Sequence, residues 1–201
     1  MASGKQHERV NLLGLAVITA GYVAALILNS RISGRSLAVL TEPHVVFGFV
    51  ISYLVGAFLV TPDLDLAEQR VRAKHHWGIL GQLWVPYGKM FAHRGLSHTW
   101  LVGPFTRLVY TALLVGLALL ALALAVRPFG YRVRVIANPS YPWGELVLVV
   151  LIGYYLSQWL HLMADGVSPW YGHQLRRRAS KARKRKKRAR AKPKAHSRRS
   201  R

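Results

Sequence analysis

Four long apolar runs constrain this 201-residue chain more than any other feature of its sequence. An apolar run of about 18 or more residues is long enough to cross the hydrocarbon core of a bilayer as a helix. A soluble bundle would need amphipathic helices to cover four such segments, and the sequence contains none of that length. We therefore predict an all-α, polytopic membrane protein with four transmembrane helices, at Val10 to Asn29, about Pro43 to Val60, Trp100 to Val126 and Glu145 to Leu162.

Positive charge is separated from this apolar part of the chain. Hydrophobic residues make up 52% of the sequence, yet the formal net charge is +22. Of the 29 lysines and arginines, 16 lie between Arg176 and Arg201, where no acidic residue occurs. Such a segment cannot bury enough apolar surface to fold on its own. The sequence thus predicts a transmembrane domain over residues 1–175 and a disordered polybasic tail over residues 176–201.

The tail predicts partners that carry negative charge. Basic residues beside a membrane attract anionic lipid headgroups, at about 1 kcal/mol per residue, and this is the interpretation that we favour for Arg176–Arg201. A second interpretation is non-specific binding of RNA, the ribosome or DNA through counterion release. The chain contains no cysteine, which excludes disulfide partners and cysteine-based metal sites.

The distribution of basic residues predicts how the chain is oriented in the membrane. Lysine and arginine accumulate on the cytoplasmic side, so the basic C-terminus and an even number of spans place both termini in the cytoplasm. The protein is then a multi-pass protein of the cytoplasmic (inner) membrane, and the loop from Pro62 to Thr99 is cytoplasmic. Because aromatic rings settle at membrane interfaces, Trp77, Trp84 and Tyr87 predict that this loop lies along the interface.

Carboxylates and histidines gather at the ends of the predicted helices. They lie before the first span, after the second, before the third and after the fourth, which in the predicted topology is always the cytoplasmic side. Ionisable groups at membrane depth are costly, so they indicate function. The residues concerned are His7, Asp63, Asp65, His93, His98, His161 and Asp165.

This set of side chains predicts a metal site. His161 and Asp165 are four residues apart and therefore share one face of a helix. Three carboxylates brought together repel one another, and a divalent cation removes that repulsion. Imidazole and carboxylate suit zinc, manganese or iron, with zinc as our first choice. Because the residues exceed the three protein ligands of a catalytic zinc site, we expect either two ions or one ion with further residues around it.

Neighbouring polar residues receive other interpretations. His44 lies at the opposite end of the second run, roughly 27 Å of helix rise from Asp63, and is excluded from the site. His75 and His76 stand among basic residues and are predicted to be solvated. Arg94 is either a clamp for an anionic substrate or an ordinary basic residue of the loop.

Several motifs together resemble a known family. Over roughly residues 1–170 the chain resembles a bacterial family of uncharacterised metal-binding membrane proteins, and it is more distantly similar to YdjM-like membrane-bound metal-dependent hydrolases. The resemblance implies a metal site formed by the seven residues above, and it implies no substrate. The motifs that carry it are Ser3-Gly4-Lys5-x-His7-x-Arg9, Pro62-Asp63-Leu64-Asp65, Trp84-Val85-Pro86-Tyr87-x-Lys89, His93-Arg94-x-x-Ser97-His98 and His161-x-x-x-Asp165.

Three functions are compatible with these features. The first is a metal-dependent hydrolase at the cytoplasmic membrane interface that cleaves a lipid or another phosphoester. In that case Asp65 or Asp165 would be the general base, and Arg94 would hold the anionic substrate. The second is a metal-binding membrane protein without catalysis. The third is a membrane tether that binds the ribosome or nucleic acid through its tail.

Overall fold

The protein is helical in every regular element that the structure describes. The computed structural model describes residues 4–32, 38–66, 71–91, 95–134, 136–170 and 174, and these contain no strand. The predicted tail, residues 176–201, lies outside the described residues. The elements in order are α1 (Gly4–Ile32), η1 (Ala38–Thr41), α2 (Pro43–Leu54), η2 (Val55–Leu59), η3 (Pro62–Asp65), α3 (Arg72–His76), η4 (Gly78–Trp84), α4 (Val85–Met90), η5 (Leu96–His98), α5 (Val102–Val126), η6 (Arg127–Phe129) and α6 (Trp143–Ala164).

Three of these helices are long and apolar enough to cross a membrane. They comprise residues Gly4–Asn29, Val102–Phe129 and Trp143–Ala164. The prediction of a fourth such helix is wrong, because α2 has only 12 residues and continues for just five more as the π-helical turn η2. The helix ends there because Thr61 adopts an extended conformation, as the residue before a proline usually does.

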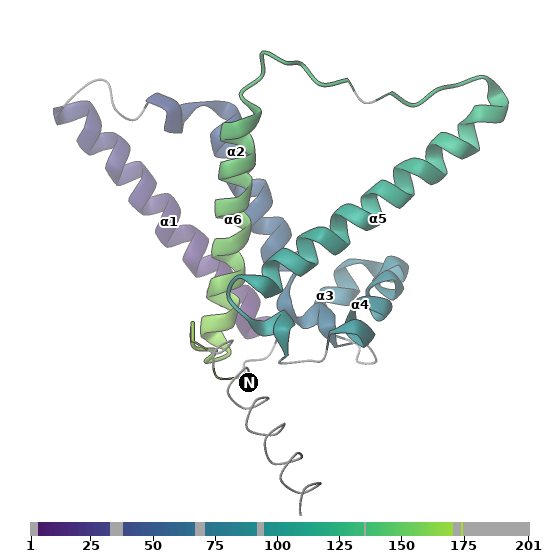
Figure 1. The fold of residues 1–201 in the computed structure, drawn as a ribbon. Coiled ribbons are helices and arrows are strands. Elements are labelled where there is room, and N and C mark those ends of the chain that lie inside the picture. Colours follow the sequence, from purple (N-terminus) through teal and green to yellow (C-terminus); the bar gives the residue numbers. More distant parts are fainter. Residues whose placement is uncertain are drawn as a thin grey trace, which may run out of the picture.

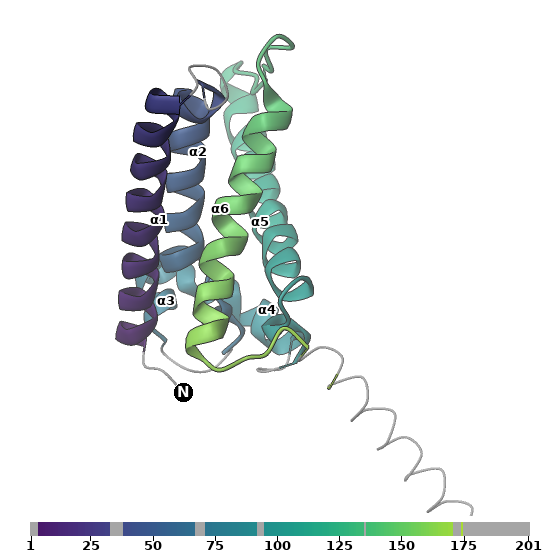
Figure 2. The ribbon, with the colours of Figure 1, turned by 90° about the vertical axis from the view of Figure 1, so that its left-hand side faces the viewer.

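The four main helices bring their ligand-bearing ends to the same end of the molecule. In Figures 1 and 2, α1 and α5 run upward from the lower end, whereas α2 and α6 run downward to it. The start of α1, the end of η2, the start of α5 and the end of α6 therefore all lie at the lower end. The upper part of α5 leans away from α2 and α6, and its aliphatic side chains are exposed.

Small residues allow α2 and α6 to pack with their backbones almost in contact. A Cβ atom on Gly153 would lie 2.4 Å from Ser52 Oγ and 2.6 Å from the carbonyl oxygen of Phe49. A Cβ atom on Gly56 would lie 2.1 Å from Ser157 Oγ. Stripes of small residues allow close helix contacts of this kind in membrane proteins. This contact fixes the position of η2 and η3 relative to the end of α6.

The segment between η3 and α5 folds into a compact cap on the lower end. Its side chains form a core with the bundle, and Trp84 and Tyr87 are fully buried in it. The Trp84 ring contacts the rings of Trp77, Tyr87 and Tyr110. Both rings are therefore enclosed by other aromatic side chains and not available to a membrane interface, whereas the placement of the loop along the interface stays a prediction.

The contact between α2 and α6 can be tested with one methyl group. We expect Gly153→Ala to lower the free energy of unfolding by about 1–3 kcal/mol, because the new Cβ meets the backbone of α2. Gly144→Ala is the control, since Gly144 lies on the same helix with nothing within 4 Å of its Cβ position. Thermal unfolding in detergent compares the two. Equal melting temperatures would show that the helices are not in backbone contact at Gly153.

Candidate metal centre

The lower end of the molecule gathers six of the seven residues predicted from the sequence. They are His7, Asp63, Asp65, His98, His161 and Asp165. They come from four separate parts of the chain, namely α1, η3, η5 and the end of α6. His93 and Arg94 lie outside the described residues. His44 lies at the far end of α2, where its Nε2 is 3.3 Å from a carboxylate oxygen of Glu145.

The turn η3 directs two aspartates to different partners. Pro62 opens this 3₁₀ turn, and a 3₁₀ helix has three residues per turn, so side chains two residues apart point in different directions. Asp63 faces α6, with its Oδ1 3.5 Å from His161 Nε2. Asp65 is buried on the other side, with its Oδ2 2.9 Å from His98 Nδ1. The two aspartates of one short motif therefore have different roles.

The end of α6 fixes the position of Asp165. The helix ends at Ala164, and Gly166 follows the C-cap Asp165 with a φ of 69°, in the left-handed region that glycine adopts easily. The Asp165 amide still donates to the carbonyl oxygen of His161 at 3.1 Å. The Asp165 side chain therefore stays on the face of His161, and its Oδ2 lies 3.9 Å from His161 Nε2.

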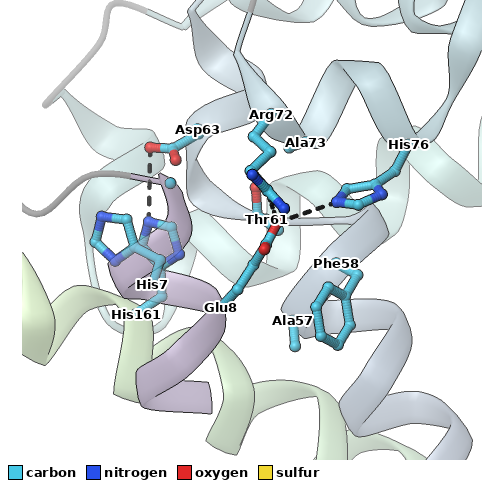
Figure 3. A pocket seen from close by; sticks show the side chains of 11 residues that line it. His7, Glu8, Ala57, Phe58, Thr61, Asp63, Arg72, Ala73, His76 and His161 are labelled. Carbon is cyan, nitrogen blue, oxygen red and sulfur yellow. Dashed lines mark hydrogen bonds and ion pairs between the residues drawn. The ribbon is translucent and has the colours of Figure 1, made fainter. Parts of the chain in front are cut away.

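His7, Asp63 and His161 form the first group of potential ligands. Each offers one ligand atom, and these atoms lie within 4.8 Å of one another. The two imidazole rings are stacked, with centroids 3.7 Å apart and planes only 6° from parallel. Figure 3 shows the rings side by side with Asp63 above them.

A second group shares one residue with the first. Asp63, His98 and Asp165 also offer ligand atoms within 4.8 Å of one another. Asp165 connects the two groups, since its Oδ1 lies 3.4 Å from His7 Nε2. Asp65 belongs to neither group. It lies behind His98 and accepts a hydrogen bond from the Ser97 hydroxyl, so it holds His98 with Nδ1 turned away from the other ligands.

Buried hydrogen bonds connect the elements that carry the potential ligands. Arg107, fully buried in α5, donates to the carbonyl oxygen of Ser97 at 2.8 Å and to Gln158 Oε1 at 3.0 Å. The amide of Gln158 in turn donates to the carbonyl oxygens of Gly56 and Val60, at 2.8 and 2.9 Å, around the π-helical turn. Our sequence analysis missed Arg107 and Gln158. The signal was present, because an arginine within an apolar run is unusual.

The positions of the potential ligand atoms suit coordination of a metal ion better than they suit hydrogen bonds between the side chains. Within the described residues, His7 Nδ1, His161 Nδ1 and Asp165 Oδ1 are buried without a hydrogen-bond partner. The separation of 3.5 Å between His161 Nε2 and Asp63 Oδ1 is long for a hydrogen bond. Two ligands of a tetrahedral zinc ion at about 2.1 Å are about 3.4 Å apart, so the spacing suits such an ion.

The carboxylates at the centre are held in their charged form. Burial raises the pKa of Asp63, but the adjacent His161, together with His7 and His98, outweighs burial and keeps that pKa below its usual value. Burial likewise raises the pKa of Asp165, and His7 and His161 outweigh it in the same way. Ionised carboxylates are the form that binds a cation.

A small cavity adjoins the first group of ligands. It has a volume of about 20 Å³, which is enough for one water molecule. His7, Asp63 and His161 line one side of it, and Glu8, Arg72 and His76 line the other (Figure 3). The potential ligands therefore have an open space beside them, with Glu8, Arg72 and His76 on its other side.

Comparison with known proteins places this site in a family. A protein of Aquifex aeolicus (strain VF5), described as an uncharacterized protein, is 37% identical over 62 residues. That stretch covers 31% of this chain and 43% of the relative, so the chain spans less than half of the relative's length. No solved structure matches the chain. Residues 2–175, a range that contains every residue that the structure describes, match the family described as uncharacterized metal-binding protein (DUF2227), and the chain belongs to that family.

Proposed function

We propose that the protein is a metal-dependent hydrolase whose centre faces the cytoplasm at the inner membrane. The observation that carries this proposal is the water-sized cavity directly beside His7, Asp63 and His161. A catalytic zinc site has three protein ligands and one position open to water, whereas a structural site has four protein ligands. Membership of a metal-binding family supports the presence of the ion.

In this proposal His7, Asp63 and His161 hold one zinc ion. When bound, the ion would polarise the substrate and lower the pKa of a water molecule to about 7. Asp165 is the general base, because its Oδ1 is buried without a hydrogen-bond partner among the described residues and lies next to His7. Asp65 is a positioning residue, since it orients His98 beside the ligands. A phosphoester is the proposed substrate class.

The membrane location rests on the exposed apolar surface. Large aliphatic side chains cover α1 and α5, and exposed apolar area on this scale marks contact with a membrane or another protein. The three long helices supply the spans, and α2 with η2 returns the chain to the lower end beside α6. Both chain ends are then cytoplasmic, and the basic tail at residues 176–201 would contact anionic headgroups.

A metal-binding protein without catalysis is the second candidate. Asp63, His98 and Asp165 form a further ligand group, so the protein has enough ligands to fill the coordination sphere of one ion or to bind two. A coordination sphere with no open position, measured by spectroscopy on a substituted metal, would distinguish this candidate from the hydrolase.

Metal content tests the ligand assignment. We expect one zinc ion per chain in the purified wild-type protein and none in Asp63→Ala or His161→Ala, because each change removes a ligand from a three-residue group. His44→Ala is the control and should keep its zinc, since His44 lies at the other end of α2. Elemental analysis gives the ratio. Two ions per chain would make Asp165 a ligand and contradict its role as the base.

A conservative change tests the role of Asp65. We expect Asp65→Asn to keep one zinc ion per chain with only a small loss of affinity, because Asp65 orients His98, which lies beside the three proposed ligands and is not one of them. Competition with a coloured chelator measures the affinity. Loss of zinc as complete as in Asp63→Ala would instead identify Asp65 as a ligand.

Reporter fusions test the orientation in the membrane. Alkaline phosphatase should be inactive when fused after residue 91 or 170 and active when fused after residue 137, between α5 and α6. Green fluorescent protein at the same positions should give the opposite pattern, which controls for expression. An active phosphatase after residue 170 would place the end of α6 outside the cell and refute a cytoplasmic centre.

A further inference from the structure

The cavity at the metal centre has a second wall that our sequence analysis did not anticipate. Glu8 follows the ligand His7 on α1, and Arg72 and His76 stand one turn apart on α3. One carboxylate oxygen of Glu8, Oε1, contacts both Arg72 Nε and His76 Nε2, the latter at 3.1 Å. Figure 3 shows the Arg72 and His76 side chains converging on this one oxygen beside the ligands.

Packing holds this wall against the cavity. Gly4 lets the Arg72 side chain lie against the start of α1, since a Cβ atom there would be 3.1 Å from Arg72 Cβ. The edge of the His76 ring meets Phe58 of η2, with ring centroids 6.0 Å apart and planes at 84°. The Arg72 side chain is nevertheless 45% exposed, so it is accessible from outside.

The arrangement has the chemistry of an oxyanion site. Arginine presents a planar fork of donors that matches phosphate oxygens, and charge-assisted hydrogen bonds of this kind are strong. An ion pair whose arginine side chain is 45% exposed contributes little to stability, so stability alone does not account for it. With Glu8 in place the cavity of about 20 Å³ admits water but no phosphate group, so an incoming anion must displace the Glu8 carboxylate.

We propose that Arg72 and His76 bind the oxyanion of a phosphate group next to the metal ligands, and that Glu8 takes the place of this anion when it is absent. The inference rests on the proposed hydrolase function and specifies how its substrate is held. It gives Arg72 the role that the sequence suggested for Arg94. The phosphate group can belong to a lipid headgroup or to a water-soluble molecule.

Phosphate binding to the zinc-loaded, full-length protein tests this proposal. We expect Arg72→Gln to weaken the binding of inorganic phosphate, measured by calorimetry in detergent, by about tenfold or more, and His76→Gln to weaken it several-fold. Glu8→Ala should have the opposite effect and tighten binding several-fold, because a competing carboxylate is removed. A loss of folding cannot mimic this gain. Dihexanoyl phosphatidic acid, tested in parallel, distinguishes a lipid headgroup from free phosphate.

Two matched controls are available at the same end of the molecule. Arg9→Gln removes an exposed arginine from α1, and His75→Gln removes the exposed histidine adjacent to His76; both should bind phosphate as the wild type does. Unchanged binding of both probes by Arg72→Gln, or weaker binding by Glu8→Ala, would overturn the proposal. Zinc content is measured on every sample. Absence of zinc or of turnover would refute the hydrolase, whereas phosphate binding that depends on Arg72 would still support the anion site.

Discussion

The close contact of α2 with α6 is the constraint on which the metal centre depends. Asp63 follows η2, the continuation of α2, by a few residues and His161 lies near the end of α6, so the spacing of these helices sets the spacing of the two ligands. Gly153 and Gly56 leave no room for a side chain at the contact, which brings the helix axes as close as backbone atoms allow. A wider separation would move η3 away from α6 and divide the ligand group.

Much of the fold could be predicted from hydropathy, because burial in a bilayer or a core requires long apolar runs. Hydropathy does not report hydrogen bonding, so the π-helical turn at Val55–Leu59 and the early end of α2 were missed. Aromatic rings suit an interface and a protein core equally well, so the sequence could not show that Trp84 and Tyr87 are buried in the core. Sequence also cannot distinguish Asp63 from Asp65, since their difference arises only when η3 turns one toward α6 and the other toward η5.

The residues missed at the site share one property, which is that their role depends on distant partners. Arg107 was visible only as an interruption of an apolar run, yet it joins η5 to α6 through Ser97 and Gln158. A buried guanidinium requires several acceptors, and here it finds them on two other elements. Glu8, Arg72 and His76 were missed for the same reason. In the sequence 64 residues separate Glu8 from Arg72, and only the folded chain brings them to one cavity.

The charge balance of the centre also argues for a divalent cation. Asp63, Asp65 and Asp165 bring three carboxylates into one small, largely buried volume, and their repulsion must be offset. Protonation of both His7 and His161 would supply positive charge. The stacked rings have centroids only 3.7 Å apart, however, so two protonated rings would repel each other in place of the carboxylates. A doubly charged ion between the imidazoles and the carboxylates would offset the repulsion among the carboxylates without a charge on either ring. The stacked histidines therefore favour a bound metal over protonation as the source of positive charge.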